Sequence, residues 1–386
     1  MKFADRMEKI EPFYVMALLG RAKQLESEGV DVIHLEVGEP DFPSPSPVVK
    51  AGMEAMASGL THYTPATGLP LLKNKIADFY LQRYGVQLDP YRVIVTPGSS
   101  GGLQALIALL VNPGENVLLT DPGYPCNRNF VTMYGGIVKS VAVSAKDQFQ
   151  FSADTIRTNW DNKTRAVLMA SPSNPTGTVV SDEALIAIAD TVASLEGTLI
   201  VDEIYHGLTY DQSLSTVLHY SDEAFAINSF SKYFGMTGWR IGWVIAPEVA
   251  VPGLEKLCQN MFLAPPTVAQ YGAIAALEPE ALAELEERRV EFKRRRDYLE
   301  RALRSIGFII PASSEGAFYI YADISAFATD SYQFCIDLLE KTGVAITPGI
   351  DFGTINAKRY VRFAYTTSVP RLQDAVSRIE GFIASL

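Results

Sequence analysis

The segment from Ser229 to Arg240, which reads SFSKYFGMTGWR, contains the residues best suited to covalent chemistry. Lys232 follows an apolar run and two serines, and it precedes two glycines and Arg240. A lysine whose amine is desolvated and lies near other charges becomes a nucleophile that forms a Schiff base with a carbonyl compound. Ser229, Ser231 and Arg240 would then surround a phosphate, because hydroxyl and guanidinium donors suit its oxygens. Taken alone, the segment also fits a surface loop that contains a lysine.

A second segment, TPGSSGGL at residues 96–103, joins the end of an apolar run to an apolar helix pattern. Free backbone N–H groups and the helix dipole at such a helix start attract phosphate, so Ser99, Ser100 and Gly101 are candidate ligands. The spacing matches neither the Walker loop nor the dinucleotide fingerprint. A plain strand-to-helix turn therefore stays open as the alternative.

Three polar residues near other apolar runs complete the candidate site. Asp202 ends the run TLIVD, at the sheet edge where α/β proteins bind ligands, and its carboxylate would keep a pyridine nitrogen protonated. A helix-capping aspartate is the alternative there. Asn174 stands in the rigid turn NPTG and would point its amide at a ligand oxygen. Arg362 lies in the apolar run YVRF, and a buried arginine needs an anion, either a ligand carboxylate or a structural Asp or Glu.

The elements that must position these residues alternate between strands and helices. Helical patterns such as 101–111 and 181–195 separate short runs that are apolar throughout. This alternation predicts an α/β fold whose sheet is covered by helices on both faces. The predicted strands span residues 92–96, 116–120, 165–170, 198–202, 225–229 and 241–246.

Residues 281–306 form a long, charged helix pattern. Its arginines and lysines suggest a nucleic-acid patch, but Glu–Arg pairs along a solvated face are the favoured interpretation. We expect this helix to link a large domain, residues 49–280, to a small domain. The small domain would combine residues 281–386 with the N-terminal arm, residues 1–48, which includes a helix over 15–29. The apolar stripe of the long helix comprises Leu282, Leu285, Val290, Phe292, Leu299 and Leu303.

The composition indicates which binding partners are excluded and which cellular compartment to expect. A net charge of −11 argues against nucleic acid and against an anionic membrane surface. The three cysteines are far apart and lack CxxC spacing, so we expect reduced thiols in a cytoplasmic protein. We expect no signal peptide and no membrane span, because the apolar runs are short. The four histidines form no metal-binding motif.

Together these segments resemble the class I/II aminotransferases, the aspartate-aminotransferase-like branch of the pyridoxal-5′-phosphate (PLP) enzymes of fold type I. The resemblance extends over almost the whole chain. It implies a large PLP-binding domain with a mostly parallel seven-stranded sheet between helices, and a smaller α+β domain. The segments that carry it are LEVGEPDF (35–42), HYTPATGLPLLK (62–73), NPTG, DEIY, SFSK with GWR, and YVRFAY.

The resemblance also implies roles for single residues. Lys232 would hold PLP as a Schiff base and then move the substrate proton, while Asp202 would pair with the ring nitrogen. Tyr205 and Asn174 would hydrogen-bond the phenolic oxygen, and Tyr124 would stack on the ring. The implied phosphate ligands are Ser99, Ser100, Gly101, Ser229, Ser231 and Arg240.

Further implied roles concern the substrate and the subunits. Gly38 and Arg362, with Asn174, resemble the site of the substrate α-carboxylate. Tyr63 resembles a tyrosine that reaches the phosphate from the neighbouring subunit, which implies a homodimer with shared active sites.

The implied activity is a ping-pong transfer of an amino group from an L-amino acid to a 2-oxo acid. We expect a neutral or apolar substrate side chain, because a buried distal carboxylate needs a second cation besides Arg362. Ser100 stands where some members of this branch have a lysine, and the arm segment 16–19 is apolar. Arg128 is the nearest alternative cation, while His206, next to Tyr205, receives no role.

The alternatives on this scaffold are an aspartate-type aminotransferase, a PLP-dependent carbon–sulfur β-lyase and a non-catalytic binding protein. Release of pyruvate and ammonia without an acceptor would indicate the lyase, and absence of a PLP spectrum would indicate the binding protein.

Overall fold

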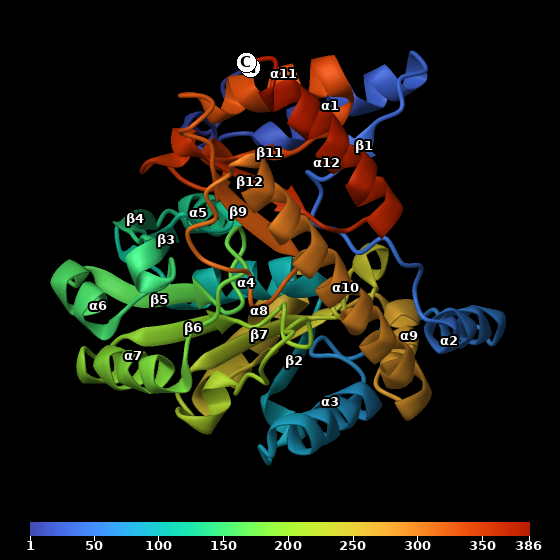
Figure 1. Ribbon diagram of the computed structural model, residues 1–386. Coiled ribbons are helices and arrows are strands. Elements are labelled where there is room, and N and C mark those ends of the chain that lie inside the picture. The colour runs from blue at the N-terminus through green and yellow to red at the C-terminus, as the bar shows by residue number, and fades with distance from the viewer.

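The computed structural model describes all residues, 1–386, and its centre is a seven-stranded sheet (Figure 1). The strand order is β2-β8-β7-β6-β5-β3-β4, and β8 alone runs antiparallel to its neighbours. This sheet confirms the predicted mostly parallel α/β architecture. Its strands are β2 (Val93–Thr96), β3 (Asn116–Asp121), β4 (Ile137–Ala142), β5 (Thr164–Ala170), β6 (Thr198–Asp202), β7 (Phe225–Ser229) and β8 (Gly242–Ile245).

Helices cover both faces of this sheet, because its central strands carry apolar side chains on both sides. Leu168 of β5 packs in a cluster with α4, α5 and α8, whereas its neighbour Val167 packs with α3, α6 and α7. Strand residues that alternate between two buried clusters explain why these strands are apolar throughout. The helices of this part are α2 (Ser46–Ala57), α3 (Pro70–Tyr84), α4 (Gly98–Leu110), α5 (Pro125–Met133), α6 (Ala153–Asn159), α7 (Asp182–Ser194), α8 (Val251–Met261) and α9 (Thr267–Ala276).

Two smaller sheets lie in the C-terminal part of the chain, and the two-stranded one joins it to the N-terminal arm. Strands β9 (Tyr319–Asp323), β12 (Tyr360–Ala364) and β11 (Thr347–Pro348) pair antiparallel, and β1 (Ile33–His34) pairs parallel with β10 (Val344–Ala345). In Figure 1 these strands lie with α1, α11 and α12 above the large sheet. The separate sheets agree with a large and a small domain, but the exact boundaries stay a prediction. The helices are α1 (Tyr14–Ser27), α11 (Ser331–Thr342) and α12 (Val369–Ile383).

Helix α10 (Pro279–Ile306) runs along both parts, as predicted for the charged segment (Figure 1). It buries Leu285, Phe292, Leu299 and Leu303, but Val290 of the predicted stripe is 58% exposed. The stripe prediction was wrong at Val290 because that residue falls on the solvent-facing side of the helix.

The charges of α10 are paired, as the Glu–Arg interpretation requires. Arg289 contacts Glu286 at 2.6 Å, and Arg304 contacts Glu300 at 2.8 Å. Arg296 is buried and donates to Asp211 at 2.7 Å. The arginines of these pairs are therefore engaged within the protein, which agrees with the Glu–Arg interpretation of the segment. No helix of the chain is both long and apolar enough to cross a membrane.

Candidate active site

A cavity of about 230 Å³ opens where β5 and β6 end and faces the middle of β12. The carboxyl ends of parallel strands are the usual ligand edge of an α/β sheet. The structure brings most of the predicted site residues together here. Those that line this cavity are Gly38, Ser99, Tyr124, Asn174, Asp202, Tyr205, Lys232 and Arg362.

Lys232 lies in the turn after β7, and its Nζ donates a hydrogen bond of 2.6 Å to the backbone oxygen of Gly38. Burial lowers the pKa of the Lys232 amine to about 8, and the charges of Arg362 and Arg240 act in the same direction. Nearby carboxylates partly oppose this shift. An amine with this pKa is partly neutral near pH 7, which is the state that attacks a carbonyl carbon.

Asp202 is the last residue of β6 and is only 5% exposed. Its Oδ1 accepts a hydrogen bond of 3.1 Å from the N–H of Ile204, in a turn and not at the start of a helix. Burial raises the pKa of Asp202 to about 7, against the effects of that N–H and of the Lys232 charge. A cationic group placed opposite this carboxylate would restore its ionised form.

Arg362 is a buried cation whose partners are all neutral. Its Nη1 donates to Oδ1 of Asn174 at 2.8 Å, and its Nη2 donates to the backbone oxygen of Glu36 at 2.6 Å. Its Nε is buried without a partner, and no carboxylate lies within 4 Å of the guanidinium. The structural Asp or Glu that the sequence left open is therefore not present, and an anionic ligand would complete the site.

A second cavity of about 340 Å³ adjoins the first, since both are lined by Gly38, Ser99, Tyr124 and Lys232. Its wall also contains Ser100, Ser231 and Arg240. It lies at the start of α4, where free N–H groups and the helix dipole favour an anion.

The guanidinium of Arg240 lies close against this helix start. Gly98 has a left-handed φ of +70°, and a Cβ at Gly98 would lie 2.5 Å from Nη2 of Arg240. Glycine is therefore required at that position, and the arginine, the helix start and the serine hydroxyls form a cup for a polyanion.

Three predicted ligands lie outside both cavities. Gly101 is buried in the first turn of α4, and Ser229 is buried with its Oγ donating to the backbone oxygen of Ile241 at 3.2 Å. Ser229 also accepts from the N–H of Ser231 at 3.0 Å, so it orients a cavity residue. Tyr63 is 83% exposed and does not line the site of its own chain.

Arg128 and His206 do not line the 230 Å³ cavity, but Arg128 lines a smaller pocket of about 20 Å³ that shares Tyr124 and Asn174 with it. Nη2 of Arg128 donates to the backbone oxygen of Asp351 at 2.6 Å. His206 is buried, with its Nδ1 at 3.1 Å from the hydroxyl of Tyr84, and burial lowers its pKa to about 3.

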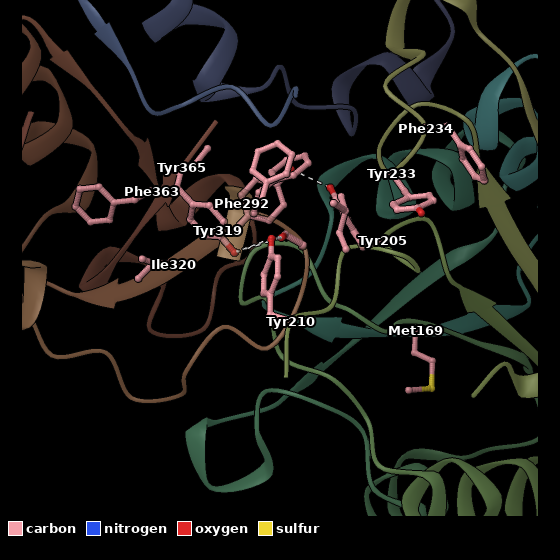
Figure 2. Close-up of a cluster of buried hydrophobic side chains, with 14 of the residues drawn as sticks. Met169, Tyr205, Tyr210, Tyr233, Phe234, Phe292, Tyr319, Ile320, Phe363 and Tyr365 are labelled. Carbon is pink, nitrogen blue, oxygen red and sulfur yellow. Dashed lines mark hydrogen bonds between the residues drawn. The ribbon is translucent and has the colours of Figure 1, made fainter. Parts of the chain in front are cut away.

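Tyr319, which contributes to the cavity wall from β9, was not among the predicted site residues. Its hydroxyl is 2.8 Å from that of Tyr205, within the buried aromatic cluster that Figure 2 shows. A Cβ at Gly38 would overlap the Tyr319 hydroxyl, which explains the glycine at that position. The ring centre of Tyr319 also lies 4.2 Å from the Arg362 guanidinium. No local pattern predicts Tyr319, because its neighbours come from distant segments.

Glu36, Phe13 and Asp351 were also missed. Glu36 and Phe13 belong to the arm, and Asp351 follows β11. Their position on the cavity wall depends on how the arm packs on the C-terminal sheet.

The chain belongs to the aminotransferase class I and II family, whose sequence profile matches residues 30–379. It is therefore a PLP-dependent transaminase. It is 38% identical to the valine–pyruvate aminotransferase of Mycobacterium tuberculosis, with 97% of each chain covered. It is 36% identical to the (5-formylfuran-3-yl)methyl phosphate transaminase of Methanocaldococcus jannaschii, with 98% of this chain and 99% of the relative covered.

Solved structures agree with this assignment. An aminotransferase from Mycobacterium tuberculosis superposes with a TM-score of 0.97 at 37% identity, and both chains are fully covered. The Thermus thermophilus aspartate aminotransferase with maleate superposes with a TM-score of 0.94 at 32% identity, with 99% of each chain covered. The resemblance stated from the sequence is confirmed.

Proposed function

We propose that this transaminase moves an amino group from an L-amino acid with a neutral or apolar side chain to a 2-oxo acid. The observation that carries the proposal is the cavity itself. It places Lys232 beside Arg362, a buried cation without an anion, and its outer wall is apolar. The relatives include valine–pyruvate and aspartate aminotransferases, so the substrate class has to come from the cavity.

The residues present fit PLP, which carries an aldehyde, a ring nitrogen and a phosphate. The amine of Lys232 suits the aldehyde. The buried carboxyl group of Asp202 suits a protonated ring nitrogen, because a cation opposite it would favour its ionised form. The cup formed by Arg240, Ser231 and the start of α4 suits the phosphate. When bound, PLP supplies a ring that spreads the negative charge left on the substrate Cα.

The chain's own residues then bind the substrate and move its proton. Arg362 would bind the α-carboxylate through its unpartnered Nε and hold Cα in one orientation. The neutral Nζ of Lys232 would take the proton from Cα and later deliver it, as a general base and acid. Tyr205 is held by the hydroxyl of Tyr319 and would donate toward an oxygen of the cofactor together with Asn174. Asp202 would stabilise positive charge at the ring nitrogen.

The choice of a neutral substrate rests on the charges of the wall. Lys232 and Arg362 are the cations that line the 230 Å³ cavity, and both already have roles. The outer wall is built by Phe13, Val15 and Leu19 of the arm region, with Phe352. A substrate carboxylate placed against this wall would be buried without a partner, which is costly.

We also propose that the active unit is a homodimer that shares its sites. Tyr63 lies outside its own site and is strongly exposed, which suits a residue that serves a neighbouring subunit. The face of α2 and the segment after it is apolar and exposed at Val49, Met53, Met56 and Leu60. We place the protein in the cytoplasm, because its three cysteines form no disulfide.

A donor screen with one common 2-oxo acid tests the substrate class. We expect alanine, valine, methionine or aromatic donors to give a higher kcat/KM than aspartate. A tenfold or greater preference for aspartate would contradict the proposal, since that ratio is about 1.4 kcal/mol of transition-state binding. Steady-state rates should show ping-pong kinetics. Release of pyruvate and ammonia without an acceptor would instead identify a lyase.

A further inference from the structure

Asp351 is a buried carboxylate on the cavity wall that the transamination steps leave unused. It ends a short turn, Gly349–Asp351, that follows β11, and it is 2% exposed. No lysine or arginine side chain lies within 4 Å of its carboxylate, and Arg128 contacts only its backbone oxygen. A buried carboxylate without a paired cation needs other donors.

Those donors come from the first turn of α1. Oδ1 of Asp351 accepts from the N–H of Tyr14 at 2.8 Å, and Oδ2 accepts from the N–H of Val15 at 3.1 Å. The N-cap residue of α1 is Phe13, whose side chain cannot accept a hydrogen bond. Asp351 therefore caps α1 from a position more than 330 residues away in the sequence.

The turn that Asp351 caps is the turn that covers the cavity. Phe13, Val15 and Met16 lie in it, Leu19 follows one turn later, and all four side chains line the wall. The buried part of α1 begins only at Leu18. The two hydrogen bonds from Asp351 thus hold the apolar end of the arm over the site.

The carboxyl group also places an acidic group on this otherwise apolar wall. Burial raises the pKa of Asp351, and the two N–H groups and the charges of Arg362 and Arg128 oppose that rise only in part. The thiols of Cys126 and Cys335 are also near enough to be affected by its charge, and Glu36 lies on the same cavity wall. A substrate carboxylate that reached this wall would face a second carboxyl group in a poorly solvated site, where the two cannot both be ionised without repulsion.

We propose that Asp351 is a specificity-determining residue, which docks the apolar turn of α1 over the cavity and repels substrates with a distal carboxylate. The inference rests on the proposed function, because it explains how a neutral side chain is selected. It assigns the selection to one residue.

The test compares the wild-type holoenzyme with Asp351→Asn, which keeps the shape of the side chain and removes its charge. We expect the ratio of kcat/KM for aspartate to kcat/KM for valine to rise at least tenfold in Asp351→Asn. The matched control is Asp330→Asn, which alters a carboxylate that caps α11 and does not line the cavity. Its ratio should stay within twofold of the wild-type ratio.

Hydrogen exchange measured on residues 13–16 reports the docking of α1 directly. We expect these amides to exchange about fivefold faster in Asp351→Asn, because the asparagine Nδ2 cannot accept a hydrogen bond and one of the two bonds to α1 is lost. Tyr14→Pro removes one of the two N–H donors, at a helix position that tolerates proline. The amides of residues 15 and 16 should exchange faster in Tyr14→Pro than in Tyr14→Ala, which keeps that donor. The comparison of Tyr14→Pro with Tyr14→Ala therefore tests the docking of α1 even if Asp351→Asn does not fold.

The outcomes separate the two proposals. Suppose that the wild type prefers valine, and that Asp351→Asn lowers kcat/KM for valine and for aspartate by the same factor. The role of Asp351 in selection is then wrong, and the proposed function stands. If residues 13–16 exchange at the wild-type rate in both Asp351→Asn and Tyr14→Pro, the docking role is wrong. If the wild type prefers aspartate tenfold, the proposed substrate class and the role of Asp351 fail together.

Discussion

The ε-amino group of Lys232 donates a hydrogen bond of 2.6 Å to the backbone oxygen of Gly38. This bond joins the turn after β7 to the segment that follows β1, so the nucleophile is held by the chain segment that also helps to form the substrate site. The arm and the cofactor site are thereby coupled through one side chain.

Replacing Lys232 with alanine should abolish turnover, with kcat lowered about a thousandfold or more, because both the covalent link and the proton-transfer group are lost. PLP should still bind without a covalent bond through the phosphate cup. Borohydride treatment of the wild type followed by peptide mapping should find the label on Lys232. A label on Lys73, a half-buried lysine outside both cavities, would contradict the assignment.

Replacing Asp202 with alanine should slow the transfer of the Cα proton more than tenfold, because the carboxylate that stabilises a cationic ring nitrogen is lost. Single-turnover absorbance measurements with a deuterated donor would isolate that step. A change of less than tenfold would show that Asp202 has a different role.

The pKa of Asp202 adds a stability test on the cofactor-free protein. Its pKa rises from 3.8 to about 7 on folding, so its favourable contribution is complete below pH 3.8 and is lost as the pH rises through 7. At pH 8 the cofactor-free Asp202→Asn variant should therefore melt no lower than the cofactor-free wild type. PLP should raise the melting temperature of the wild type more than that of Asp202→Asn. If PLP raised the melting temperature of both proteins equally, a charge pair between Asp202 and the ring nitrogen would be contradicted.

The sequence predicted the sheet well wherever strands are buried on both faces. The runs ending at Thr96, Asp202 and Ser229 became β2, β6 and β7 with almost the expected bounds. Strand β4 was missed, because it lies at the edge of the sheet and mixes exposed and half-buried residues in IVKSVA. The helix predicted over 15–29 spans Tyr14–Ser27, and it begins where Asp351 caps it.

The residues of the candidate site also fall into those that a local sequence pattern predicts and those that it does not. Asp202 and Ser99 were predictable because each stands at the junction of a strand and a turn or helix, where local pattern and ligand position coincide. Tyr319 and Asp351 were not predictable, because their roles come from contacts with Gly38 and Val15 that no local pattern encodes. Sequence periodicity describes an element's own faces, and it carries no information on which distant segment packs against them.

The shared-site homodimer can be tested with two inactive variants. Tyr63→Ala should lose most of its activity if Tyr63 serves the neighbouring subunit, whereas Tyr91→Ala, at another exposed tyrosine, should keep it. A mixture of Tyr63→Ala and Lys232→Ala should regain part of the activity after subunit exchange, because a mixed dimer has one site with both residues intact. Full activity in a monomeric protein would refute the proposal.

Arg128 provides the last test, because it is the cation nearest to the cavity that has no role in the reaction. Its Nη2 holds the backbone oxygen of Asp351, and its side chain does not line the 230 Å³ cavity. Arg128→Ala should therefore lower kcat/KM for valine and aspartate by similar factors, because it removes a contact to the backbone but leaves the carboxyl group of Asp351 and its two bonds to α1 in place. The loss of a hydrogen bond from a charged donor suggests a factor of about ten.

The ratio between the two donors is the decisive quantity in this experiment. We expect it to stay within about threefold of the wild-type value in Arg128→Ala, and to be unchanged in Arg165→Ala, which alters an exposed arginine paired with Glu115. A loss confined to aspartate and exceeding tenfold would mean that Arg128 binds a distal carboxylate during the reaction. The arginine would then have to leave the Asp351 carbonyl, and the neutral-substrate proposal would be wrong, since a second cation would be available to a dicarboxylate after all.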